Sequence, residues 1–198
     1  MSYHSRDLAN ANSALLVNIV TNDFEDSNDV LSGVKLQRKL ERNAFLLGGN
    51  NYNAPYETVG SFLDRSHYDV KSVENYYNGL NINYNKLMSE YQASYTPGLT
   101  ESKLTECIPD FMVEALKEAL IAFEKKIPGF SDPRIVMTAV ESRSSSPVRI
   151  IRNDNYESLS HHGIYPCGEG AGYAGGITSS AVDGLKVAEA IIKKVYSL

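Results

Sequence analysis

Five glycines fall within nine residues near the C-terminal end of the sequence, at Gly168, Gly170, Gly172, Gly175 and Gly176. Gly170, Gly172 and Gly175 match the spacing G-x-G-x-x-G. Glycine allows backbone N–H groups to approach an anion closely, and the N-terminus of a following helix favours negative charge. This glycine loop, residues 168–176, is therefore a candidate contact for a phosphate or a polarised carbonyl. Tight packing of the backbone between a helix and a sheet is the alternative that the spacing leaves open.

The loop does not satisfy the other requirements of a dinucleotide fingerprint. Such a fingerprint needs a second strand with an acidic residue about 20 positions further on. Only 22 residues follow Gly176, and the helix predicted there uses nearly all of them. No Gly-Lys-Ser/Thr follows the loop, which argues against a P-loop nucleotide hydrolase. The sequence therefore predicts an anion or cofactor contact rather than a complete adenine-dinucleotide clamp.

The cysteines and histidines carry weaker signals. Cys107 and Cys167 lie 60 positions apart without a C-x-x-C pair, which favours reduced thiols over a disulfide framework or a zinc site. A nearby helix N-terminus could lower the pKa of Cys167, although a small buried side chain is an equal interpretation. His161 and His162 are expected to be exposed. No metal site is predicted, and the catalytic residues stay unknown.

Hydrophobic spacing predicts the elements around this loop. Apolar residues recur at helical spacing from about Val30 to Leu47, and Gly48 and Gly49 end that helix. Asp110 is expected to cap a second amphipathic helix that ends near Ile127, and a third helix is expected from about Ser179 to Tyr196. Gly184 inside the third helix indicates close packing there. Strands are predicted at residues 14–20, 135–140, 148–151 and 163–167.

The region from residue 50 to 95 has a different composition. It holds eight of the 13 tyrosines and eight asparagines, with little aliphatic content. The pattern favours a loop-rich insertion with a short helix around residues 56–63. No periodicity supports an element at 75–85, where disorder is the alternative. Together the elements predict an α+β (mixed) fold.

Composition and charge exclude several classes of protein. The 198 residues carry 24 acidic and 19 basic side chains, for a net charge of −5, and no run of Lys or Arg exceeds two. A nucleic-acid partner is therefore not expected. No apolar stretch approaches the roughly 20 residues of a membrane span. The first residues, 1–7, lack the apolar region of a leader. A cytoplasmic protein without a membrane partner is the expectation.

Four segments of the chain resemble blocks of one protein family. Residues 165–191, which read YPCGEGAGYAGGITSSAVDGLKVAEAI, resemble the C-terminal motif of the NAD(FAD)-utilising, FAD-dependent dehydrogenases. Residues 140–150 (VESRSSSPVRI) resemble a second block, and residues 1–14 a third. Residues 37–41 together with 47–55 resemble a fourth. The blocks run in family order over nearly the whole chain.

The resemblance implies an FAD-dependent oxidoreductase in which the glycine loop contacts the flavin cofactor. The residues expected to bind FAD are Gly168, Glu169, Gly170, Gly172, Tyr173, Gly175, Gly176 and Ile177. Arg143, Ser145, Ser146 and Arg149, around the Ser-rich turn at 144–147, are expected near the flavin or an unidentified small-molecule substrate. His4, Arg6 and Asp7 fall in a block that would face the substrate cavity. NAD(P)H is the electron donor expected for the parent enzyme.

The resemblance also implies a domain organisation. Residues 1–21 would end an N-terminal segment of the flavoprotein core, 22–134 would form an inserted substrate or helical domain, and 135–198 would return to the FAD-binding α/β domain by a strand, a loop and a helix. The N-terminal Rossmann half of that family does not occur in the sequence. The alternative function is therefore a catalytically incomplete binding or interaction domain that needs a Rossmann-bearing partner.

Overall fold

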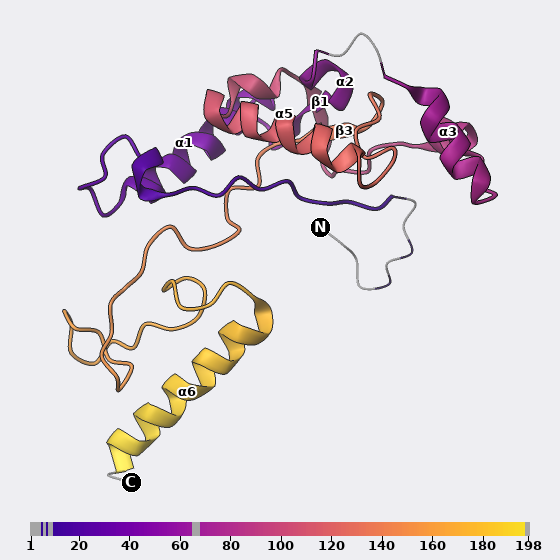
Figure 1. Cartoon of the computed structure of the whole chain (residues 1–198). Coiled ribbons are helices and arrows are strands. Elements are labelled where there is room, and N and C mark those ends of the chain that lie inside the picture. Colours follow the sequence, from indigo (N-terminus) through magenta and orange to yellow (C-terminus); the bar gives the residue numbers. More distant parts are fainter. Residues whose placement is uncertain (1–4, 6, 8–9, 65–67, 197–198) are drawn as a thin grey trace. The chain divides into compact units, whose positions relative to one another are not determined.

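The computed structural model describes residues 5, 7, 10–64 and 68–196, and it confirms an α+β fold of helices with a small mixed sheet (Figure 1). The chain divides into two compact units. Unit 1 consists of Met1–Asn18 and Lys39–Glu141, and unit 2 of Ile19–Arg38 and Ser142–Leu198. His4 and Arg6, which were expected at a substrate cavity, lie outside the described residues. The predicted boundaries of the domains at 21 and 134 stay a prediction.

The first helix ends where the sequence predicts and begins two residues later than predicted. Helix α1 spans Ser32–Leu47 and follows a short 3-10 turn, η1, at Thr21–Asp23. Gly49 has a φ of 92°, a left-handed conformation that favours glycine after a helix. A Cβ at Gly48 would lie 2.1 Å from the carbonyl oxygen of Asn53. The two glycines thus end α1 and let the chain turn closely into the first strand.

The sheet of unit 1 has three short strands in the order β2-β1-β3. Strand β1 (Ala54–Thr58) pairs in parallel with β2 (Leu99–Glu101), with Ala54 opposite Leu99. It pairs antiparallel with β3 (Val136–Thr138), with Tyr56 opposite Thr138. Helix α2 (Val59–Phe62) continues directly from β1, and the Thr58 hydroxyl accepts from Ser61 N–H to cap it. The short helix predicted at 56–63 is therefore half strand and half helix.

The apolar core of unit 1 lies where α2 and α5 meet the 3-10 turn η2 (Leu104–Glu106). Helix α5 spans Asp110–Glu124. Asp110 lies in its first turn and the capping position is Pro109, so the predicted cap is one residue too late. The core cluster consists of Val59, Phe62, Leu104, Val113 and Leu120. Each such side chain contributes about 1.5–3 kcal/mol when fully buried. Met112, Val113 and Leu120 are thus the core residues of α5, whereas its Phe111, Ile121 and Phe123 are exposed.

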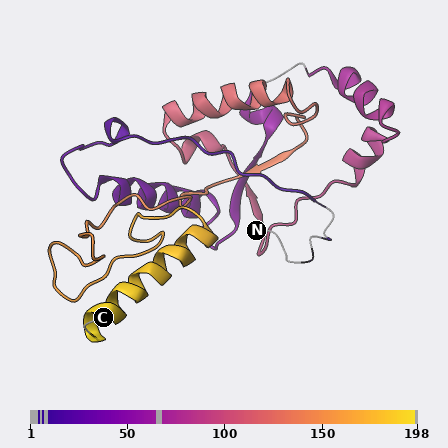
Figure 2. The same cartoon turned by 60° about the horizontal axis from the view of Figure 1, so that its bottom comes forward.

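Two helices form in the asparagine-rich region for which no element was predicted. Helix α3 spans Val70–Gly79, and α4 spans Tyr84–Glu90 (Figure 2). Asp69 and Asn83 cap them by accepting from Ser72 N–H and Lys86 N–H. The sequence lacks a clear apolar period here because tyrosines take the place of aliphatic residues at the contacts. Side-chain caps supply the start signals that the periodicity does not.

A row of tyrosine hydroxyl groups joins α3 and α4 to the chain after α5. The Tyr84 hydroxyl donates to Asp132 Oδ2 at 2.8 Å, and Asp132 also pairs with Arg134. Desolvation and the Asp132 carboxylate raise the pKa of Tyr84 well above its usual value. The full tyrosine row is Tyr68 to Glu124, Tyr77 to the carbonyl of Pro128, Tyr84 to Asp132, and Tyr91, which accepts from Val136 N–H.

The C-terminal stretch of unit 2, residues 142–198, has one long helix and otherwise irregular chain. Helix α6 spans Ile177–Tyr196, two residues longer at its start than the spacing predicts. The strands predicted at 148–151 and 163–167 do not form, apart from an isolated bridge between Arg152 and Ser158. The strand predicted at 14–20 does not form either. These runs stay largely exposed, and apolar β-branched residues favour strands only where a sheet buries them.

Helix α6 also overturns the expectation made for Gly184. A Cβ at Gly184 would meet no atom of the described residues within 4 Å, so the close packing predicted at this glycine is wrong within the chain. None of the helices that the structure describes is both long and apolar enough to cross a membrane.

Candidate functional site

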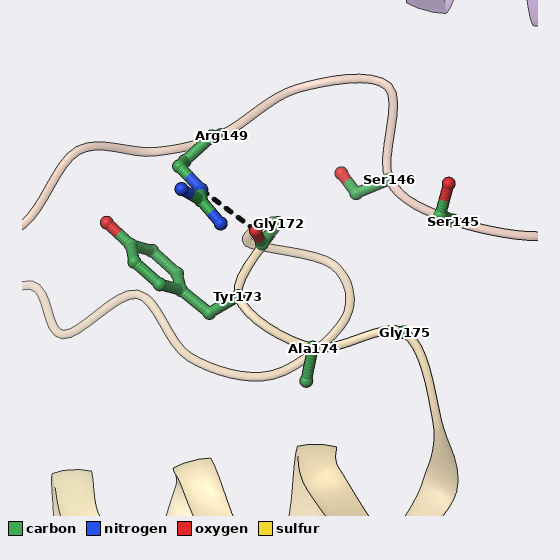
Figure 3. A pocket seen from close by; sticks show the side chains of 7 residues that line it. All are labelled: Ser145, Ser146, Arg149, Gly172, Tyr173, Ala174 and Gly175. Carbon is green, nitrogen blue, oxygen red and sulfur yellow. Dashed lines mark hydrogen bonds between the residues drawn. The ribbon is translucent and has the colours of Figure 1, made fainter. Parts of the chain in front are cut away.

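The glycine loop and the serine turn (residues 144–147) line one pocket of about 340 Å³ within unit 2 (Figure 3). This volume is at the lower end of the range for small-molecule sites, about 300–1,000 Å³. Residues more than 20 positions apart in the chain meet here. The lining residues are Ser145, Ser146, Arg149, Gly172, Tyr173, Ala174 and Gly175. All but Ala174 are among the residues that the sequence singled out.

The loop folds tightly because two of its glycines adopt conformations that other residues avoid. Gly168 and Gly172 have φ values of 68° and 82°. Gly172 N–H donates to the Glu169 carbonyl at 2.8 Å, and Tyr173 N–H donates to the Gly168 carbonyl at 3.0 Å. A Cβ at Gly172 would lie 2.5 Å from the carbonyl oxygen of Val148. Gly172 is therefore required for backbone packing, but it packs against irregular chain at Val148 and Arg149 rather than between a helix and a sheet.

Other glycines of the loop face open space instead. A Cβ at Gly170 or Gly175 would meet no described atom within 4 Å, and neither residue has a positive φ. Gly175 lines the pocket, so its missing side chain leaves room for a ligand to approach the backbone. The glycine loop thus combines two uses of glycine, a packed position at Gly172 and an open position at Gly175.

Polar groups of the serine turn and of Arg149 surround the pocket. Arg149 Nε donates to the carbonyl of Gly172 at 2.9 Å, and its guanidinium carbon lies 4.8 Å from the centre of the Tyr173 ring. Figure 3 shows Arg149, Ser146 and Ser145 along one stretch of chain, from which the Arg149 side chain reaches to Gly172 of the loop. The Ser146 hydroxyl lies 3.1 Å from the Gly170 carbonyl oxygen. The same hydroxyl lies 2.9 Å from the Val148 carbonyl oxygen, so the bond from Arg149 is the firmer link between this stretch of chain and the glycine loop.

Helix α6 begins directly after the pocket. Ile177 is its first residue, and the Ser179 hydroxyl exchanges hydrogen bonds with the backbone of Gly176 at 3.2 and 3.0 Å. The first N–H groups of a helix lack partners within it and carry partial positive charge. The hydroxyl oxygen of Ser180 is buried and has no hydrogen-bond partner among the described residues. The N-terminal turn of α6 therefore offers backbone N–H groups unpaired within the helix, together with the Ser180 hydroxyl, as hydrogen-bonding groups for a ligand.

Several of the residues predicted to bind lie outside the pocket lining. These are Gly168, Glu169, Gly170, Gly176, Ile177 and Arg143. His162 is exposed, as expected, and its Nδ1 lies 2.9 Å from Glu157 Oε1. Cys167 is exposed, so the interpretation of Cys167 as a buried side chain is wrong. Cys107 is the buried thiol, and desolvation raises its pKa to about 11, which keeps it protonated.

Two residues beside the pocket were not found from the sequence. Arg152 forms a two-pronged ion pair with Asp183 of α6, with N–O distances of 2.7 and 3.0 Å. Asp183 Oδ2 also accepts a hydrogen bond from Gly168 N–H at 2.8 Å. The hydrogen bond from Arg152 holds the pKa of Asp183 below its usual value, so the carboxylate stays charged. The pair is 31 residues apart, and no spacing or motif in the sequence indicates it.

Unit 1 contains a smaller polar pocket of about 150 Å³ that includes Glu57. The buried Glu57 carboxylate accepts from the Ser61 hydroxyl at 2.6 Å and from Leu104 N–H at 3.0 Å. These bonds join β1, α2 and η2, which gives Glu57 a structural role. No group of three or more residues able to hold a metal ion occurs in the described part of the chain.

Comparison with known proteins identifies the family. The family model described as "FAD-dependent protein, C-terminal domain-like" matches residues 1–144. The chain belongs to this FAD-dependent family. The match includes Arg143 and ends within the serine turn, before the glycine loop. A protein of Clostridium beijerinckii described as uncharacterized is 48% identical over 194 residues, which cover 98% of this chain. The chain spans 33% of the length of that relative.

Membership of the FAD-dependent family supports FAD as the cofactor, whereas nothing in the comparisons supports NAD(P)H. The pocket residues fit part of such a group. Its open glycine, arginine and hydroxyl groups suit a phosphate or a flavin carbonyl, and the unpartnered Ser180 hydroxyl adds capacity nearby. A pocket of about 340 Å³ holds a portion of FAD rather than the whole dinucleotide.

Proposed function

We propose that this chain is the C-terminal portion of an FAD-dependent oxidoreductase, of the dehydrogenase type, and that its glycine loop contacts the flavin cofactor. The observation that carries the proposal is the pocket in which Gly172, Gly175 and Tyr173 meet Ser145, Ser146 and Arg149. Family membership supports the identity of the cofactor. Residues 135–198 would then form the C-terminal part of the FAD-binding domain, and residues 22–134 the inserted substrate domain.

The residues of the chain would act on the cofactor by electrostatics. FAD supplies the redox chemistry when it is bound. Arg149 would place positive charge beside a phosphate or a ring carbonyl, since only its Nε is used by the Gly172 carbonyl. The N-terminus of α6 would add partial positive charge. Fixed donors of this kind stabilise negative charge without reorganisation, which is how proteins favour a reduced, anionic ring.

A titration of FAD into the purified chain, followed by flavin fluorescence, tests the contact. Circular dichroism and size-exclusion chromatography establish that each variant is folded. We expect saturable binding by the native chain and a loss of about tenfold or more in affinity for Gly175→Val, whose side chain would enter the pocket without backbone strain. Gly184→Ala is the matched control, because it also adds a side chain at an open glycine but lies away from the pocket.

The possible results of the titration distinguish where FAD contacts the chain and whether the longer protein is needed. Equal weakening by Gly175→Val and Gly184→Ala would place the FAD contact elsewhere on the chain. A folded native chain that shows no saturable response to FAD contradicts a flavin contact made by this chain alone. Binding restored by adding the remaining two thirds of the Clostridium beijerinckii relative would show that the contact needs the longer protein.

The exposed apolar face of α6 favours a second function, that of an interaction domain. Val187 is buried, whereas a stripe on the same helix is left exposed: Val182 (45%), Leu185 (66%), Ile192 (49%) and Val195 (67%). A contiguous apolar stripe usually marks an interaction surface. We propose that it packs against a Rossmann-bearing segment or partner. Size-exclusion chromatography of the chain mixed with the Rossmann-bearing segment tests this. Leu185→Glu should reduce the association of the two without unfolding the chain.

A further inference from the structure

The ion pair between Arg152 and Asp183 connects three stretches of chain around the glycine loop. Asp183 lies on α6, after the loop, and accepts from Gly168 N–H at the start of the loop at 2.8 Å. Arg152 also donates to the carbonyl of Pro166 at 2.7 Å. Only 9% of the Arg152 side chain and 14% of the Asp183 side chain are exposed. The pair therefore fixes the residues that enter the loop to the helix that leaves it.

Arg152 also holds the aromatic residue of the pocket. Its guanidinium carbon lies 3.6 Å from the centre of the Tyr173 ring, closer than that of Arg149 at 4.8 Å. Backbone N–H of Arg152 donates to the Tyr173 hydroxyl at 3.2 Å, and this hydroxyl donates to the Ile150 carbonyl at 3.2 Å. A cation over an aromatic ring is attracted to the negative face of the ring. The Tyr173 ring is thus fixed by two arginines and two hydrogen bonds.

Neither member of the pair lines the pocket. From the contacts above, we infer that Arg152 and Asp183 are positioning residues that hold the glycine loop and Tyr173 in the geometry that contacts the cofactor. The inference rests on the proposed function for its ligand. A fork of two parallel hydrogen bonds defines orientation as well as distance, which a lysine or an amide at either position does not reproduce.

Two readouts test the inference on the full chain. Amide hydrogen exchange of residues 168–176 reports the order of the loop without any ligand, and FAD titration reports the contact. We expect Asp183→Asn to increase exchange in the loop and to weaken FAD binding about tenfold. Arg152→Lys keeps the charge but not the fork, and should do the same. The double variant should be no weaker than either single variant, because the two residues act as a unit.

Lys194→Met is the matched control. Lys194 also joins α6 to the irregular part of unit 2, through Glu157 Oε2 at 2.8 Å, but among the described contacts it makes no hydrogen bond or ion pair with residues 168–176. We expect this variant to lower the melting temperature while leaving both loop exchange and FAD affinity unchanged. If Lys194→Met weakens FAD binding as much as Asp183→Asn does, the effect is general destabilisation and the inference is overturned.

Further results of these experiments also decide whether Arg152 and Asp183 position the loop. Unchanged exchange of residues 168–176 in both Asp183→Asn and Arg152→Lys overturns the inference, as does a loosened loop with unchanged FAD affinity. If the native chain does not respond to FAD, the proposed flavin contact fails. Loop exchange then shows by itself whether the pair orders the loop. Asp183→Glu, which keeps the carboxylate, should recover more loop protection than Asp183→Asn.

Discussion

Unit 1 gathers Phe62, Leu120 and their neighbours into one buried apolar cluster, whereas the buried apolar side chains in the described C-terminal stretch of unit 2 are the scattered Pro166, Ala171 and Val187. Unit 2 instead ties its irregular chain to α6 through Arg152–Asp183 and Glu157–Lys194. The pocket of unit 2 is therefore positioned by charged and aromatic contacts rather than by an apolar core. Such contacts define geometry well but leave apolar surface exposed.

The largest effect is expected where the apolar core is densest. Leu120→Ala removes a side chain that is 2% exposed and should lower the free energy of unfolding by about 3 kcal/mol. Leu185→Ala makes the same chemical change in unit 2, at a side chain that is 66% exposed, and should change stability by less than about 0.5 kcal/mol. Urea unfolding followed by circular dichroism compares them. Equal losses would contradict the contrast between the units.

Acidification should distinguish the units next. Arg152 lowers the pKa of Asp183, and Lys194 lowers that of Glu157. Because each folded-state pKa lies below the unfolded one, the stabilisation is present above about pH 4 and is lost as the pH falls through the folded-state pKa. Hydrogen bonds from Arg134 also lower the pKa of Asp132 in unit 1, against the desolvation that would raise it. Unit 1 retains its apolar cluster under these conditions.

Hydrogen exchange below pH 4, corrected for its intrinsic pH dependence, measures this difference. We expect residues 150–170 to lose protection at a higher pH than α5. Asp183→Asn should flatten the response of unit 2, since the titrating carboxyl is gone. Simultaneous loss of protection in both units, with no change in Asp183→Asn, would refute the idea that these ion pairs maintain unit 2.

A smaller effect is expected in the polar part of unit 1. Tyr84→Phe removes only the hydroxyl that donates to Asp132, whose side chain is fully buried. We expect a loss of about 1–2 kcal/mol, because a buried acceptor loses one partner while Arg134 remains. Urea unfolding measures it, and Tyr76→Phe, on a half-exposed ring, is the control. A neutral Tyr84→Phe would show that the tyrosine row adds no stability to unit 1.

The smallest effect has the opposite sign. Gly184→Ala should raise the stability of α6 by about 0.5–1 kcal/mol, because glycine is unfavourable in a helix and no described atom lies within 4 Å of the added Cβ. Thermal unfolding followed by circular dichroism measures the change. A destabilising Gly184→Ala would indicate that α6 packs against another segment at this glycine in solution.

The sequence predicts the long helices well because each carries its own local signals. The apolar period and Gly48–Gly49 define α1, and the stripe of α5 and α6 defines most of their length. The prediction of strands at 148–151 and 163–167 was wrong. A short β-branched run has the same sequence pattern whether or not a partner strand is present to pair with it. Ile150, Ile151 and Ile164 remain about half exposed.

The residues of the candidate site likewise fall into those that the sequence predicts and those that it does not. The glycine loop could be found from its spacing, and the serine turn from its turn residues together with the family resemblance. The structure brings Ser145, Ser146 and Arg149 to the loop, while their contact with a cofactor stays a prediction. Arg152 and Asp183 could not be found, because an ion pair 31 residues apart has neither a period nor a motif. The same holds for the contact of Gly172 with Val148, which depends on how the irregular chain folds back.

The tyrosine row has a consequence for changes in chain length. Tyr68, Tyr77, Tyr84 and Tyr91 reach partners at residues 124, 128, 132 and 136, which follow one another at intervals of four. Inserting or deleting one residue between two of these tyrosines would displace every later hydroxyl from its partner. The asparagine-rich segment, although exposed and poor in aliphatic residues, should therefore tolerate substitutions far better than insertions or deletions.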